Sequence, residues 1–278
     1  MSVLDFLYKT APGRVMLKAL TRPGVSRLAG GFLDTRASRL LIGPFVRRNG
    51  IDLSEYESDG FTCFNDCFCR RIKPGLRPVD MAPEALISPC DGLLSVYTLH
   101  RDTVLPVKQS AYTLSSLLAS DEVCRELEGG LALIFRLCVD NYHRYCYVDS
   151  GVQGRTVHIP GVLHTVRPVA LGSVPVFVRN TREYTVIVSE SFGRLVQMEV
   201  GALLVGRIRN LHGPGRVRRG QEKGCFLYGG STVIVLLREN AAAVDEVYIK
   251  NTQDGVETPV KCGQRIGRSL LPAGPGGE

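Results

Sequence analysis

From residue 86 to the C-terminus, the sequence repeats one pattern: short apolar and β-branched runs separated by glycine and proline turns. The clearest runs are at 131–139, 176–178, 184–188, 195–205 and 232–237. Turn sequences at 149–151 and 213–215 lie between them. Helical periodicity in this region is limited to about 113–128. The pattern predicts an α+β protein whose core is a mostly antiparallel, barrel-like β structure.

The first 50 residues differ from the rest of the chain in charge and periodicity. Their apolar spacing predicts amphipathic helices at about 2–20 and 35–48. Nine basic against two acidic residues give a net charge of +7, which equals that of the whole chain. Basic amphipathic helices bind anionic membrane surfaces, and a helical cap with a solvated basic face fits equally well. We divide the chain into a basic, membrane-associating helical segment, 1–50, and a β-rich core, 51–278.

Several classes of protein and site are disfavoured by composition. The nine cysteines follow no signal-peptide pattern, which predicts reduced thiols in a cytosolic protein. Cys63, Cys67 and Cys69 lack zinc-site spacing and a nearby histidine, so we expect no metal. No run of 18 apolar residues predicts a membrane span. The isoelectric point is near 9.0, but the chain has no Trp, and stacking aromatics do not interleave its basic residues. We therefore expect no nucleic-acid partner.

Four short segments carry residues suited to chemistry. They are ISPCDG at 87–92, NYHRYC at 141–146, VLHTV at 162–166 and GGST at 229–232. Each alone has an ordinary interpretation: an Asp-Gly pair forms a turn, a buried histidine packs in a core, and Gly-Gly-Ser forms a loop. Only their combination and order indicate a function.

The combination resembles the bacterial phosphatidylserine decarboxylase family. The matching motifs are SPCDG, then YHR, then EVGALLVGRI at 199–208 and GQEKGCFLYGGST at 220–232. An upstream segment, FNDCFCRRIKPGLRPVD at 64–80, is similar to the entry segment of that family. The resemblance extends from about residue 3 to residue 267.

This resemblance implies a self-cleaving enzyme with a pyruvoyl cofactor. Ser231 would attack the carbonyl carbon of Gly230, and elimination and hydrolysis would leave a pyruvoyl group on the fragment 231–278. The fragment 1–230 would remain as its partner in a heterodimer, with a higher oligomer left open. Asp91 matches the aspartate of the family's triad, which orients the base that activates serine. The pyruvoyl carbonyl would condense with the substrate amine and accept electrons as CO2 leaves.

The chain departs from the family pattern at one position. The usual motif carries two histidines three residues apart, and here the first is His143 but the second is Cys146. We expect His143 to protonate the substrate after CO2 is lost, and His164 to supply the missing imidazole for self-cleavage. The alternatives are that Cys146 acts as the base, which requires a lowered thiol pKa, or that His143 serves both steps.

The expected substrate is phosphatidylserine, reached by peripheral attachment to the cytoplasmic face of the membrane. Arginines at 207, 209, 216, 218 and 219 form a basic segment that could meet a phosphate, or could simply be a solvated loop. Two alternatives stay open. One is a pyruvoyl-dependent decarboxylase of a soluble amino acid. The other is a non-catalytic β-barrel carrier or binding module, although the segment 198–202 lacks the lysine that a carrier needs.

Overall fold

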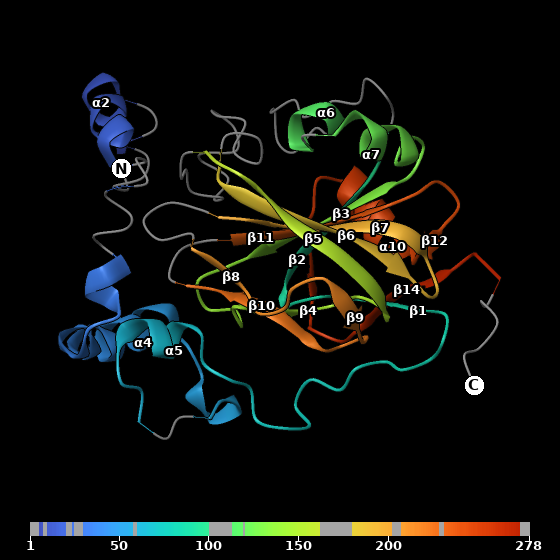
Figure 1. The fold of residues 1–278 in the computed structure, drawn as a ribbon. Helices are drawn as coiled ribbons and strands as arrows, with labels where there is room; N and C mark the ends of the chain where they lie inside the picture. The colour runs from blue at the N-terminus through green and yellow to red at the C-terminus, as the bar shows by residue number, and fades with distance from the viewer. Residues whose placement is uncertain are drawn as a thin grey trace.

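A large antiparallel sheet occupies the centre of the molecule (Figure 1). The computed structural model describes residues 6–7, 10–20, 24, 30–57, 60–99, 113–118, 120–161, 180–201, 207–227 and 231–272. The eight strands of this sheet are, in order across it, β13 (Thr258–Val260), β2 (Gly92–Thr98), β3 (Leu131–Leu137), β11 (Ser231–Leu237), β7 (Gly193–Val200), β6 (Arg182–Ser189), β5 (Gly151–Ile159) and β9 (Gly215–Val217). Every neighbouring pair is antiparallel.

Two smaller sheets pack against the large one. The first has the order β1 (Ala85–Ile87), β14 (Arg265–Ser269) and β12 (Ala242–Val244), and the second has the order β4 (Arg144–Cys146), β10 (Glu222–Phe226) and β8 (Ile208–Asn210). The α+β class and the antiparallel pairing are thus confirmed. The barrel-like closure is not, because the edge strands β13 and β9 of the large sheet do not pair with each other within the described residues.

After Ser231 and Thr232, strand β11 is apolar, as expected of a strand with both faces covered. Val233 and Val235 belong to a core that lies between the large sheet and the two smaller sheets. Ile234 and Leu236 belong to a second core on the opposite face. Alternate residues of a strand face opposite sides of its sheet, so Ser231 faces the first core.

Short helices cover the second core. The predicted helical stretch at 113–128 forms two of them, α6 (Leu114–Leu117) and α7 (Asp121–Glu126), which lie over one face of the sheet in Figure 1. The stretch is divided because the Ser120 side chain accepts a hydrogen bond from the Val123 N–H and so begins a new helix. Helix α10 (Glu246–Gln253) does not cover the second core; its Tyr248 belongs to the first core.

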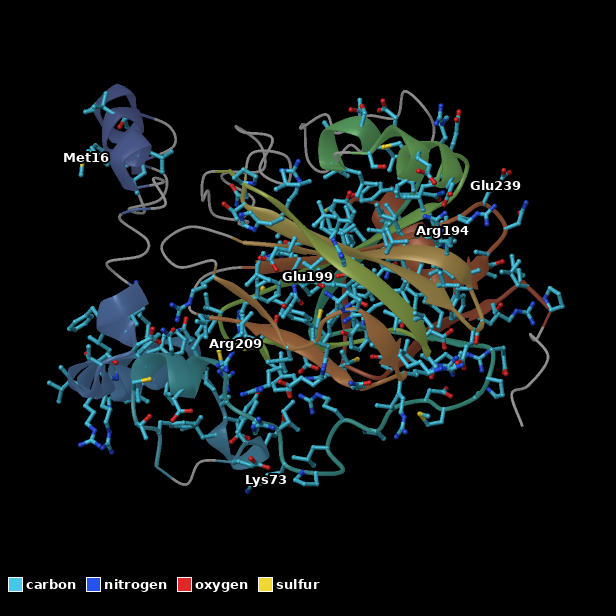
Figure 2. The ribbon with its side chains drawn as sticks, in the orientation of Figure 1. Met16, Lys73, Arg194, Glu199, Arg209 and Glu239 are labelled. Carbon is cyan, nitrogen blue, oxygen red and sulfur yellow. The ribbon has the colours of Figure 1, made fainter. Side chains whose placement is uncertain are left out.

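The N-terminal helices lie to one side of the sheets in Figure 1, although Leu17 of α2 (Ala11–Leu20) belongs to the second core. They are α2, η1 (Arg36–Leu41), α4 (Ile42–Asn49), η2 (Leu53–Glu55) and α5 (Phe64–Phe68). Leu33, Ile42 and Phe45 pack with Phe64 and Phe68 in a third, smaller core. Met16 on α2 lies far from Glu199, which sits among the strands (Figure 2). No helix of the described residues has the length and apolar character needed to cross a membrane.

Candidate active site

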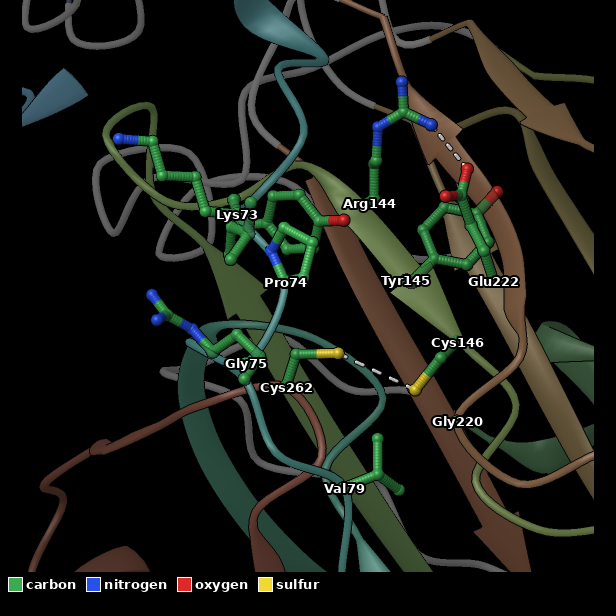
Figure 3. A pocket seen from close by; sticks show the side chains of 13 residues that line it. Lys73, Pro74, Gly75, Val79, Arg144, Tyr145, Cys146, Gly220, Glu222 and Cys262 are labelled. Atoms are coloured by element: carbon green, nitrogen blue, oxygen red, sulfur yellow. Dashed lines mark hydrogen bonds and ion pairs between the residues drawn. The ribbon is translucent and has the colours of Figure 1, made fainter. Parts of the chain in front are cut away.

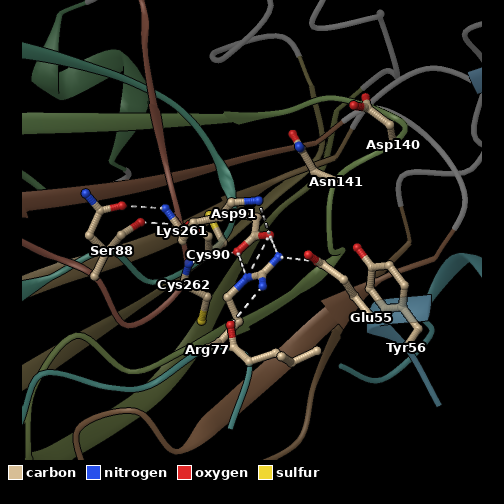
Figure 4. A network of polar contacts seen from close by, with 12 residues as sticks. Glu55, Tyr56, Arg77, Ser88, Cys90, Asp91, Asp140, Asn141, Lys261 and Cys262 are labelled. Carbon is tan, nitrogen blue, oxygen red and sulfur yellow. Dashed lines mark hydrogen bonds and ion pairs between the residues drawn. The ribbon is translucent and has the colours of Figure 1, made fainter. Parts of the chain in front are cut away.

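Asp91 lies in the turn between β1 and β2, with only 2% of its surface exposed. Its carboxylate accepts hydrogen bonds from Arg77 Nε at 3.0 and 3.1 Å, from Arg77 Nη2 at 2.8 Å and from the Cys262 N–H at 2.8 Å. Figure 4 shows this network. The hydrogen bonds to Asp91 raise the pKa of Arg77, so the guanidinium stays charged. Asp91 is therefore held as a buried, arginine-paired carboxylate, and no described histidine contacts it.

His143 lies in the loop between β3 and β4 and is fully buried. Its Nδ1 is 2.9 Å from the carbonyl oxygen of Asn141. A carbonyl oxygen can only accept, so Nδ1 carries the hydrogen and Nε2 keeps its lone pair. Nε2 is buried without a hydrogen-bond partner among the described residues. Burial lowers the pKa of His143 to about 3, so this imidazole is neutral at physiological pH and can accept a proton through Nε2.

Arg70 fixes the loop that carries His143. Its Nη2 donates to the carbonyl oxygens of Asp140 at 2.6 Å and Asn141 at 3.1 Å. The guanidinium lies 4.2 Å from the centre of the Tyr56 ring, and Arg70 is 1% exposed. The carbonyl that selects the tautomer of His143 is thus itself held by a buried cation. This contact was missed from the sequence, although Arg70 lies within the matched segment 64–80.

Ser231 is the first residue of β11 and is fully buried. Its Oγ has no hydrogen-bond partner among the described residues. In the sheet, Ser231 pairs with Leu137, and the neighbouring rung joins Thr232, Arg136 and Leu93. Ser231 and the Asp91 turn therefore lie at the same end of the large sheet. Their strands are separated by β3 alone, which corresponds to about 10 Å at the usual strand spacing.

Cys146 stands where the family pattern has its second histidine, and the structure places it beside the Asp91 turn. Its N–H donates to the carbonyl oxygen of Pro89 at 2.8 Å. Gln197 Nε2 on β7 donates to the Cys146 carbonyl oxygen at 2.9 Å. The Cys262 thiol is 3.7 Å from Cys146 Sγ. The contribution of Cys262 was missed from the sequence, because no local pattern surrounds it.

Two expected site residues cannot be placed. His164 and Gly230 both lie outside the described residues. The structure therefore places the Asp91 turn, the His143 loop, Cys146 and Ser231 near one end of the large sheet, with no hydrogen bond among these four side chains within the described residues. The role of His164 stays a prediction.

A pocket of about 200 Å³ opens beside Cys146 (Figure 3). Its walls include Lys73, Arg77, Tyr142, Arg144, Cys146 and Cys262. Burial raises the pKa of Tyr142, which keeps its hydroxyl protonated. Arg144 donates to Glu222 Oε1 at 2.5 Å and to the Cys69 carbonyl oxygen at 2.7 Å. The pocket is thus polar at its rim, and it reaches the thiol of Cys146 and the arginine that holds Asp91.

The two glutamate-containing motifs meet in a buried ion pair. Lys223 Nζ on β10 lies 2.8 Å from both carboxylate oxygens of Glu199 on β7 and 3.0 Å from Asn210 Oδ1. Burial raises the pKa of Glu199, and Lys223 opposes that shift. This pair links the large sheet to the sheet that carries Cys146, so these motif residues support the site and do not line it.

The arginines at 207–219 do not form one basic patch. Arg219 is buried and pairs with Asp149 at 2.7 Å, so it is not available to a phosphate. Arg207 pairs with Asp34 at 2.9 Å. Neither of the two interpretations left open for this segment, a phosphate contact or a solvated loop, fits Arg219, which is buried in its ion pair with Asp149.

Comparison with known proteins agrees with these motifs. Residues 64–268 match the family model described as phosphatidylserine decarboxylase. The chain is 40% identical over 267 residues to "Phosphatidylserine decarboxylase proenzyme 2" of Clostridium acetobutylicum, covering 96% of this chain and 91% of the relative. It is 39% identical over 274 residues to "Phosphatidylserine decarboxylase proenzyme" of Ruminiclostridium cellulolyticum, with the same coverage. The chain belongs to the phosphatidylserine decarboxylase family of carboxy-lyases.

Proposed function

We propose that this chain is a proenzyme that cleaves itself between Gly230 and Ser231 and then decarboxylates phosphatidylserine. The buried Ser231 hydroxyl carries the proposal. It has no hydrogen-bond partner among the described residues, although it stands at the start of a central strand. Leaving a buried polar group unpaired costs about 1–3 kcal/mol. A nucleophile that attacks the preceding carbonyl explains why serine is kept in this position.

The cleavage chemistry needs only this chain and one water molecule. Ser231 Oγ would lose its proton to a base and attack the Gly230 carbonyl carbon, and the peptide C–N bond would break to give an ester. Loss of the Ser231 Cα proton would then break the Cβ–O bond and release residues 1–230 as a carboxylate. Water would hydrolyse the resulting dehydroalanine, with loss of ammonia, to the pyruvoyl group at the start of 231–278.

The described residues support His143 as the base, which is the alternative in which one imidazole serves both steps. Its Nε2 is unprotonated, buried and unpaired. Cys146 Sγ is instead engaged by the Cys262 thiol. Asp91, held by Arg77, would act as a fixed negative charge that stabilises the positive charge on the base after it has accepted the Ser231 proton. His164 remains the competing candidate, and the variants described below separate the three.

In the mature enzyme, the pyruvoyl group would supply a carbonyl that accepts the electrons released with CO2. The residues of this chain would position it and handle protons. His143 would take the proton that the substrate ammonium group loses on condensing with that carbonyl, and after CO2 leaves it would return this proton to the substrate carbon as a positioned general acid. The ring of Phe68, whose centre is 4.0 Å from that of His143, would keep water from the imidazole.

We also propose that the N-terminal segment attaches the enzyme to an anionic membrane at the cytoplasmic face. Phe32, Leu40 and Leu41 are 51%, 83% and 42% exposed. The four arginines of η1 and α4 are exposed beside them: Arg36, Arg39, Arg47 and Arg48. Apolar side chains and arginines on one short helical segment are suited to the interface of an anionic bilayer.

A denaturing gel and a CO2-release assay test this function. Wild-type protein should separate into 1–230 and 231–278, and Ser231→Ala should stay a single chain of 30.4 kDa. Thr232→Val is the matched control, because its hydroxyl is also buried and unpaired but faces the opposite side of the sheet. Splitting of Ser231→Ala at this bond would refute the mechanism. Turnover of free amino acids, but not of phosphatidylserine vesicles, would assign a soluble substrate instead.

A further inference from the structure

Cys146 and Cys262 form a close thiol pair beside the Asp91 turn. The Cys262 thiol lies 3.7 Å from Cys146 Sγ (Figure 3). Both residues also contact the Pro89 carbonyl oxygen, which accepts from the Cys146 N–H at 2.8 Å and from the Cys262 thiol at 3.5 Å. The S–S distance of a disulfide is about 2.05 Å. The two sulfurs therefore need to approach each other by only about 1.7 Å to bond.

The pair lies in the wall of a pocket that opens to the surface. Cys146 and Cys262 both line the 200 Å³ pocket, and so do the exposed residues Lys73, Pro74 and Gly75. Cys90 is close in sequence to Asp91, but it is fully buried and is not part of the pocket wall. The pair is thus distinguished by both proximity and access.

We propose that Cys146 and Cys262 are a redox modification site, at which a low-molecular-weight disulfide of the glutathione class oxidises them to a disulfide. The Cys146 thiolate attacks one sulfur of the oxidant and releases one thiol, which leaves a mixed disulfide. Cys262 then loses its proton to solvent, attacks Cys146 Sγ and releases the second thiol. Two protein thiols are oxidised, and one small disulfide is reduced to two thiols.

The hydrogen bond between the two thiols supports this order of attack. Cys262 is the donor of this pair: its thiol hydrogen lies toward both Cys146 Sγ at 3.7 Å and the Pro89 carbonyl oxygen at 3.5 Å, and Cys146 Sγ is the acceptor. The same hydrogen bond, followed by burial, raises the pKa of the Cys262 thiol well above its usual value. Cys146 is therefore suited to the first attack and Cys262 to the second.

The modification has a distinct consequence in a cleaved chain. Cys262 is the only cysteine in 231–278, and Cys146 lies in 1–230. The disulfide would therefore join the two fragments covalently, and this consequence rests on the proposed cleavage. In an uncut chain, the same bond would tie β4 to the loop that follows β13, next to Asp91.

The test treats the purified full-length protein with oxidised glutathione and then alkylates the remaining thiols. Without reductant, the two fragments should migrate together on a denaturing gel, and reductant should separate them. A non-reduced peptide map should join the peptides that contain Cys146 and Cys262. Glutathione bound as a mixed disulfide with no joined peptides, or Cys262 joined to Cys90, would overturn the proposal.

Matched variants identify the partners. Cys146→Ser and Cys262→Ser should each abolish the joined species, whereas Cys124→Ser, which changes a half-buried thiol on α7, should retain it. A joined species that survives in Cys146→Ser would contradict the pairing. The peptide map of wild-type protein decides the question even if a variant fails to fold. If the chain remains uncut, the same peptide map still tests whether Cys146 and Cys262 are joined. The missing cleavage would then count against the proposed self-cleavage and not against the disulfide.

Discussion

The single hydrogen on the His143 ring determines what this residue can do. With Nδ1 committed to the Asn141 carbonyl, Nε2 is the nitrogen that can take a proton. If His143 is the base for self-cleavage, His143→Ala should remain uncut, with its cleavage rate reduced by roughly 10²–10⁴-fold. His164→Ala and Cys146→Ala should then process normally, as followed on denaturing gels over time. Loss of cleavage in His164→Ala alone would assign the base to His164, and loss in Cys146→Ala alone would assign it to the thiol.

Arg70 should control the protonation of His143 through the loop. Arg70→Gln removes the donor to two carbonyls and a charge that itself lowers the pKa of His143. We expect cleavage to slow by roughly 10- to 100-fold, by analogy with the loss of a hydrogen-bond partner that orients a metal-binding histidine. Arg70→Lys should restore part of the rate, because it keeps the charge but not the planar fork.

The pH profile distinguishes this positioning role from a general loss of stability. In the wild-type protein, the His143 pKa of about 3 keeps the base unprotonated, so the cleavage rate should stay level as pH falls from 8 to about 5. In Arg70→Gln, the pKa of His143 should rise, because Arg70 is one of the causes that lower it, although burial, the larger cause, remains. The fall in rate on acidification should therefore begin at a higher pH than in the wild-type protein. Arg71→Gln, at an exposed neighbouring arginine, is the control and should keep the level profile. Identical profiles in all three proteins would argue against the role.

At this scale, sequence reasoning named the candidate site residues but not their partners. Asp91, His143 and Ser231 are recognisable because each lies in a short motif. Arg77 and Cys262, which hold the Asp91 carboxylate, are separated from it by 14 and 171 residues. Contacts over such distances depend on how the strands pair, and they leave no local pattern in the sequence.

Among the elements, the N-terminal helices carry the proposed membrane attachment. Phe32→Ser with Leu40→Ser should weaken binding to anionic vesicles, because both side chains are exposed beside arginines. Val152→Ser with Val188→Ser, two exposed apolar residues that face each other across β5 and β6, is the matched control. Vesicle flotation at low and high salt separates the apolar contribution to binding from the charge-dependent one. Salt weakens only the second, because exposed charges are screened over a Debye length of about 8 Å at physiological ionic strength. Equal flotation of the two variants would show that the N-terminal segment is not what attaches the protein to the vesicles.

Four strands were predictable because their apolar runs are bounded by turn residues: β3 falls within a predicted run, and β6, β7 and β11 each overlap one. Two features of the elements were not predictable. The helical stretch at 113–128 is interrupted at Ser120, where a local side-chain hydrogen bond competes with helix continuation. Closure into a barrel depends on whether edge strands meet, and the alternation of residues along each strand says nothing about that.

For the whole molecule, the position of β11 predicts that cleavage does not separate the fragments. The strand pairs over seven residues with β3 and over six with β7, and β13 and β14 of the same fragment pair with β2 and β1. After cleavage, 1–230 and 231–278 should elute together from a sizing column without denaturant and separate only in denaturant. Dissociation in native buffer, with reduced thiols, would show that the central sheet does not hold the small fragment.

Because β11 is buried on both faces, the central sheet would have to fold before the chain can cleave itself. If Ser231 is the attacking residue, its hydroxyl reaches its buried position only when β11 is paired between β3 and β7. A chain that never completes its central sheet would therefore never acquire its prosthetic group, and would stay inert. Self-cleavage would therefore occur only in chains that have formed the central sheet. The fraction of cleaved chains in a cell would then report the fraction of chains that have folded.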